Sequence, residues 1–159
     1  MELRSSAYRP GDPIPLRYTC DGEGISPAFG WQGEPPQTKS FVFLLHDPDA
    51  PREGGFTHWL IFDIDPTIHQ IDQGSSKEAP FVDFGVQGRN DGGTLGYFAP
   101  CPPSGTHRYI ARLFSLDVEL TLAPGATRQE VEAAMDGHIL AQAALMGTYT
   151  RRKGAHQAA

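Results

Sequence analysis

Three side chains stand where a ligand group could bind, because each lies near the start of an apolar segment: His58, His107 and Tyr109. Residues at the end of a strand lie where a rigid scaffold meets solvent, and ligand sites tend to form there. Imidazole and phenol groups can donate hydrogen bonds to a ligand. His58, His107 and Tyr109 are therefore candidate ligand-binding residues.

Two aspartates follow the apolar run 41–45 (FVFLL), which predicts a strand buried on both faces. Asp47 comes directly after this strand, and so we expect it to be partly buried. Asp49 follows a proline, and the presence of an aspartate here is explained equally well by turn formation and by ligand binding. An aspartate beside a histidine holds one tautomer of the ring and favours the imidazolium ion. Both aspartates are therefore candidate ligand-binding residues.

Metal-dependent and hydrolytic chemistry are weaker interpretations of the same residues. Adjacent side chains of the stiff HDPD segment cannot all point inward, and the chain has no His-x-His or Glu-x-x-His spacing. A Gly-x-Ser-x-Gly motif is also missing, and Cys101 lies between two prolines with no evident base. The sequence thus predicts no catalytic residue, no cofactor and no metal site, and a binding protein in place of an enzyme. The residues considered as metal ligands are His46, Asp47, Asp49, His58 and His107.

A proline-rich turn precedes His107. Pro100, Pro102 and Pro103 fix the backbone of this turn, so it keeps its shape at little entropic cost when a ligand binds. Gly105 can adopt a positive φ and lets the chain turn sharply into the next strand. We therefore expect the turn to form one edge of the binding site.

Composition limits the partners and the compartment. A net charge of −6 and a pI near 5.4 argue against nucleic-acid binding. No apolar run approaches the roughly 18 residues of a membrane span, and the first residues have no signal-peptide pattern, so we expect a cytoplasmic protein without integral membrane association. Cys20 and Cys101 are expected as two reduced thiols, with one long-range bridge as the alternative.

The pattern of the chain predicts a mainly β protein with many turns, since it contains 18 glycines and 14 prolines. Its 159 residues suit one domain, residues 1–150, followed by a mobile tail, 151–159. Residues 70–96 are expected to form a long surface excursion with at most one short strand or helical turn. A capping box at Thr127 and an apolar stripe predict a helix that runs to Gly147. Strands are predicted at 16–19, 41–45, 58–65, 109–118 and 119–122.

Three segments together resemble the phosphatidylethanolamine-binding protein family, in particular its bacterial and archaeal branch, often labelled Raf kinase inhibitor-like. They are CDGEGISPAFGW (20–31), DPDAP (47–51) with HW (58–59), and GYFAPCPPSGTHRYIARLFSL (96–116). The resemblance extends to GHILAQAALMGTYTR (137–151). It implies a two-sheet antiparallel β-sandwich with a C-terminal α-helix and an anion pocket at one end.

The resemblance also implies a site and its partners. In that family the pocket takes the phosphate of phospholipid headgroups or similar small anions, and a regulated protein partner and a homodimer fit the same resemblance. The alternative that it permits is a proteinase or kinase inhibitor that acts through a surface loop such as 70–95. Ala99 departs from the family pattern, in which glycine is usual at this position. The residues carried over to the pocket are Asp47, His58, Pro103, His107 and Tyr109.

Overall fold

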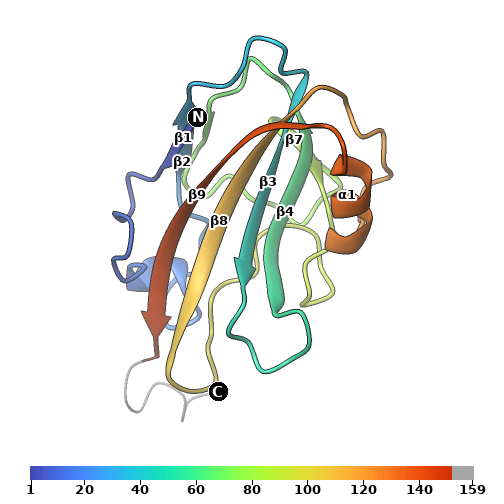
Figure 1. Cartoon of the computed structure of the whole chain (residues 1–159). Helices are drawn as coiled ribbons and strands as arrows, with labels where there is room; N and C mark the ends of the chain where they lie inside the picture. The colour runs from blue at the N-terminus through green and yellow to red at the C-terminus, as the bar shows by residue number, and fades with distance from the viewer. Residues whose placement is uncertain (152–159) are drawn as a thin grey trace.

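Two antiparallel sheets pack face to face in the computed structural model, which describes residues 1–151 (Figure 1). The smaller sheet has the strand order β1-β2-β5, and the larger one has the order β6-β7-β4-β3-β8-β9. A 3-10 helix, η1, and an α-helix, α1, are the helical elements of this part of the chain. The predicted sandwich with a helix toward the C-terminal end is therefore confirmed. The bounds are Glu2–Arg4 (β1), Leu16–Tyr18 (η1), Phe29–Gln32 (β2), Ser40–Asp47 (β3), Phe56–Ile64 (β4), Gln70–Ile71 (β5), Phe81–Val82 (β6), Gly85–Gln87 (β7), Thr106–Leu116 (β8), Arg128–Met135 (α1) and Ile139–Thr150 (β9).

Aromatic rings fill the space between the two sheets. The ring centroids of Phe29 and Phe43 lie 4.7 Å apart, and those of Trp31 and Phe41 lie 5.6 Å apart. Each pair joins β2 of the small sheet to β3 of the large sheet. Because successive residues of a strand point to opposite faces, the other face of β3 needs a separate cover.

The helix α1 provides that cover on the far face of the large sheet (Figure 1). Val42 and Leu44 of β3 share one apolar cluster with Val131 and Met135 of α1. β3 is therefore buried on both faces, as the FVFLL run predicts. Asp47 is the last residue of β3, so this buried strand positions its side chain at the end of the sheet.

The helix prediction is right at its start and wrong at its end. Thr127 forms the predicted capping box with Glu130, but α1 ends at Met135. Gly137, at a φ of 81°, then turns the chain into β9, which pairs with β8 along its length. The spacing of apolar residues in 138–146 suits a helix, but pairing with β8 is the stronger constraint, because tertiary contacts override local propensity.

Three further predictions of local structure are wrong. Residues 16–19 contain the 3-10 helix η1 and not a strand, while 119–122 lie outside any strand. Residues 70–96 hold three short strands, β5, β6 and β7, where at most one was expected. Two of these, β6 and β7, extend the large sheet beside β4, a long-range pairing that the weak pattern of this segment does not reveal.

The described residues contain no helix that is long and apolar enough to cross a membrane. Arg151, the first residue of the predicted tail, lies with its guanidinium 3.2 Å from the carboxylate of Asp21. The rest of the predicted mobile tail, 152–159, lies outside the described residues.

Candidate functional site

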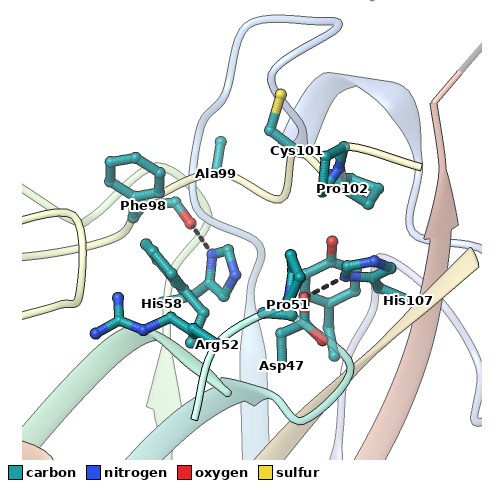
Figure 2. A pocket seen from close by; sticks show the side chains of 13 residues that line it. Asp47, Pro51, Arg52, His58, Phe98, Ala99, Cys101, Pro102 and His107 are labelled. Atoms are coloured by element: carbon teal, nitrogen blue, oxygen red, sulfur yellow. Dashed lines mark hydrogen bonds and ion pairs between the residues drawn. The ribbon is translucent and has the colours of Figure 1, made fainter. Parts of the chain in front are cut away.

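A pocket of about 280 Å³ opens where β3 ends and β8 begins. The β3–β4 loop lies along one side of it, and the segment 98–103 forms another (Figure 2). Five of the six predicted ligand-binding residues line this pocket. The lining consists of Asp47, Ala50, Pro51, Arg52, Phe56, His58, Phe98, Ala99, Cys101, Pro102, Pro103, His107 and Tyr109.

Asp47 and His107 form a buried hydrogen-bonded pair, drawn as a dashed line in Figure 2. The Nδ1–H of His107 donates to Oδ2 of Asp47 over 2.7 Å, and the two residues are 7% and 3% exposed. Oδ1 of Asp47 accepts a bond from the backbone N–H of Asp49 at 2.8 Å. Because both carboxylate oxygens are held, the imidazole ring is fixed with its Nε2 as the remaining polar atom.

His58 comes from β4 at an irregularity in the ladder. Leu45 pairs with Trp59 and His46 pairs with Thr57, so His58 is the extra residue of a β-bulge. A β-bulge changes the direction in which the side chain of the extra residue points. The Nδ1–H of His58 donates to the carbonyl of Phe98 at 2.6 Å, and the N–H of Phe98 donates back to the carbonyl of His58 at 2.8 Å.

Burial sets the charge of His58. The residue is 4% exposed, and this burial lowers the pKa of its imidazole to about 4, against the opposing effects of the bond to Phe98 and of the Asp47 carboxylate. His58 is therefore neutral at neutral pH.

Tyr109 lies between the two histidines on the inner face of β8. Its ring centroid is 5.2 Å from that of His58 and 6.5 Å from that of His107. Burial raises the pKa of its phenol well above the ordinary value, so the hydroxyl keeps its proton. No hydrogen bond joins this hydroxyl to another described residue, which leaves it as a donor for a ligand.

The proline-rich segment is fixed by a disulfide between Cys20 and Cys101, whose Cα atoms are 5.4 Å apart. The prediction of two reduced thiols is therefore wrong. The two residues are 81 positions apart in sequence, and spacing alone gives no sign of their meeting. The backbone N–H of Cys20 also donates to the carbonyl of Pro100 at 3.1 Å. Pro103 lines the pocket on this side, as the resemblance implies.

Asp49 is the predicted site residue that does not line the pocket. Its carboxylate accepts two bonds from the Arg108 side chain and one from the Arg108 backbone N–H, each 2.9 Å long. The side-chain bonds to Arg108 lower the pKa of Asp49 to about 2. Asp49 thus ties the β3–β4 loop to β8 at the surface, next to the site.

Sequence reasoning missed three residues at the mouth of the pocket. Arg52 lies with its guanidinium carbon 5.6 Å from the centroid of the Phe56 ring, and Phe98 contributes a second aromatic ring. The cationic residue directly after DPDAP is the one signal in the sequence that could have indicated Arg52. Nothing local marks Phe56 or Phe98, because their neighbours come from other parts of the chain.

The structure does not support the alternative of a metal site within residues 1–151. In this part of the chain, no three His, Cys, Asp or Glu side chains lie close enough together to hold a metal ion. His46, one of the residues considered for it, donates from Nε2 to the carbonyl of Gly54 at 2.8 Å and accepts from Thr57 at 3.2 Å. That no metal is needed stays a prediction.

Comparison with known proteins gives relatives over almost the whole chain. Residues 4–150 match the family model described as phosphatidylethanolamine-binding protein. A UPF0098 protein of Methanothermobacter thermautotrophicus is 48% identical over 151 residues, which are 95% of this chain and 99% of that protein. A UPF0098 protein of Aquifex aeolicus is 48% identical over 154 residues, or 95% of this chain and 89% of its own length.

Solved structures agree with these matches. A phosphatidylethanolamine-binding protein homologue from Chlamydia trachomatis has a TM-score of 0.87 at 41% identity, covering 95% of this chain and 97% of its own. YbcL of Escherichia coli, described as a member of the mammalian family, has a TM-score of 0.87 at 27% identity, covering 95% and 98%. The chain thus belongs to the phosphatidylethanolamine-binding protein family.

Proposed function

We propose that this protein binds the phosphate group of a small phosphorylated ligand in the pocket, without chemical conversion. The buried Asp47–His107 pair is the observation that carries the proposal. Asp47 holds the Nδ1 side of His107, so that a protonated ring can donate from Nε2 to an anion. The hydroxyl of Tyr109 offers a second donor beside it.

The remainder of the pocket suits an organic group attached to the phosphate. Phe56, Phe98, Pro102 and Pro103 give it an apolar lining, and Arg52 supplies one positive charge at the mouth. A pocket with apolar walls and a few convergent polar groups is typical of a small-molecule site. A free phosphate ion and the headgroup of a lipid could make the same contacts through the phosphate group. They differ in how much of the apolar part of the pocket they occupy.

Binding without catalysis is supported by the state of Cys101. Its sulfur is bonded to Cys20, so it is no nucleophile. Inhibition of a proteinase or kinase through the loop 70–95, regulation of a protein partner and a homodimer stay predictions. So does the cytoplasmic location, and the disulfide weighs against it, because such bonds persist mainly in oxidising compartments.

Titration calorimetry tests the proposal with inorganic phosphate, O-phosphoethanolamine and a short-chain phosphatidylethanolamine as probes. We expect His107→Ala to weaken binding of O-phosphoethanolamine by about 10- to 100-fold, the loss of one charge-assisted hydrogen bond. The matched control is His69→Ala, since His69 is exposed, pairs with Glu34 and does not line the pocket. Absence of binding by the wild type, or equal losses in both variants, would contradict the proposal.

A further inference from the structure

His58 presents a hydrogen-bond acceptor to the pocket, not a donor. A carbonyl oxygen can only accept, so the proton between His58 and Phe98 belongs to Nδ1 of the ring. In a neutral imidazole with this tautomer, Nε2 carries a lone pair. Figure 2 shows the second ring nitrogen of His58 pointing away from Phe98, on the side of Pro51 and His107. No hydrogen bond joins it to another described residue.

The surroundings keep this ring neutral. The titratable and charged groups around His58 come from several elements: Asp47 and His46 of β3, Asp91 after β7, Arg52 of the β3–β4 loop, and His107 and Tyr109 of β8. Asp47 and Asp91 favour a charged His58, but burial outweighs them and lowers its pKa to about 4. Above that pH the Nε2 atom is an acceptor that a ligand must satisfy.

We propose that the pocket selects phosphate monoesters that keep one proton over phosphate diesters and sulfate esters. A bare oxygen opposite the Nε2 lone pair of His58 forms no hydrogen bond and repels it, whereas a P–OH group donates to it. The Tyr109 hydroxyl, and His107 when its ring is protonated, then donate to the other phosphate oxygens. Diesters such as phosphatidylethanolamine, and sulfate esters, carry no such proton near neutral pH.

This inference rests on the proposed function and refines it, so the probes share an aminoethyl group and differ in the acid. They are O-phosphoethanolamine (monoester), 2-aminoethyl sulfate and glycerophosphoethanolamine (diester). Titration calorimetry is done at about pH 5.5, where the monoester is largely monoanionic because its second pKa is about 6. The three acid groups then carry nearly the same negative charge, so the number of charges does not separate the probes.

We expect the wild type to bind the monoester at least about tenfold more tightly than either other probe, since they leave the buried acceptor unpaired. In His58→Asn the side-chain amide can still donate to the Phe98 carbonyl, but the Nε2 acceptor is gone. The preference should then shrink to about threefold or less. His69→Asn, outside the pocket, should keep it, and a thermal melt of each variant reports whether the fold is intact.

The wild-type comparison decides between the two proposals even if His58→Asn does not fold. Equal affinity for the monoester and the sulfate ester, with binding to both, overturns the selection of a protonated phosphate and leaves phosphate binding in place. Tighter binding of the sulfate ester or of the diester overturns it as well. Failure of all three probes to bind contradicts the proposed function itself.

Discussion

His58 and His107 occupy two sides of one pocket, and they differ in what receives the Nδ1 proton. On the β8 side, His107 donates to the buried carboxylate of Asp47. On the β4 side, His58 donates to the backbone carbonyl of Phe98, in a segment fixed by the Cys20–Cys101 disulfide. In the proposed binding mode, the same residue type donates to an anion on one side and accepts a hydrogen bond on the other. The group that accepts the Nδ1 proton, a carboxylate for His107 and a carbonyl for His58, determines the role of each histidine.

The disulfide holds the segment that bonds to His58, and its removal should have the largest effect on stability. Closing a loop between residues 81 positions apart restricts the unfolded chain, a contribution of about 4.5 kcal/mol in the chain-entropy account. We expect the Cys20→Ser/Cys101→Ser variant to lose unfolding free energy of this size in urea titrations. Thiol labelling of both cysteines in the unreduced, unfolded wild type would show that the bond is absent.

Burial of His58 on the β4 side should also link stability to pH. The pKa of His58 is about 4 in the folded state, against the ordinary histidine value of 6.5, so the unfolded state binds more protons between these limits. The contribution of the neutral His58 ring to the unfolding free energy should therefore be fully present above about pH 6.5. The unfolding free energy should fall by about 3 kcal/mol as the pH drops to 4. Burial also lowers the pKa of His46, which adds a smaller slope of the same sign.

Urea titrations at several pH values measure this slope, and His58→Asn should remove most of it. A wild type that is equally stable at pH 4 and pH 6.5 would mean that His58 is not buried as a neutral ring.

Asp47→Asn should have the smallest of the three effects. The amide keeps the shape but removes the carboxylate charge beside His107, so phosphate monoester affinity should fall by about 10- to 30-fold. The preference for monoester over sulfate ester should persist, because His58 is unchanged. Titration calorimetry measures both quantities.

Asp49→Asn is the matched control, since Asp49 bonds to Arg108 at the surface and does not line the pocket. Its effect on affinity should stay within about twofold, and its effect on stability near 1 kcal/mol or less. A larger loss of affinity in Asp49→Asn than in Asp47→Asn would reverse the assignment of the two aspartates.

The sequence predicts the β8 side of the pocket better than the β4 side. Asp47 follows an apolar run and His107 opens another, and both runs form strands whose ends meet. The role of His58 depends on a bulge, on a carbonyl 40 residues away and on burial, none of which has a local signal. The disulfide and the strand β9 were missed for the same reason, because long-range pairing determines both.

The opposite roles of the two histidines can be observed directly in ¹⁵N spectra of the imidazole rings, assigned with the His58→Asn and His107→Ala variants. Spectra are recorded near pH 6 with and without O-phosphoethanolamine. We expect His58 to carry its proton on Nδ1 only and its bare Nε2 resonance to shift when the ligand binds. We also expect bound His107 to be protonated on both nitrogens. A His58 ring protonated on both nitrogens, or a ligand that perturbs neither ring, would contradict it.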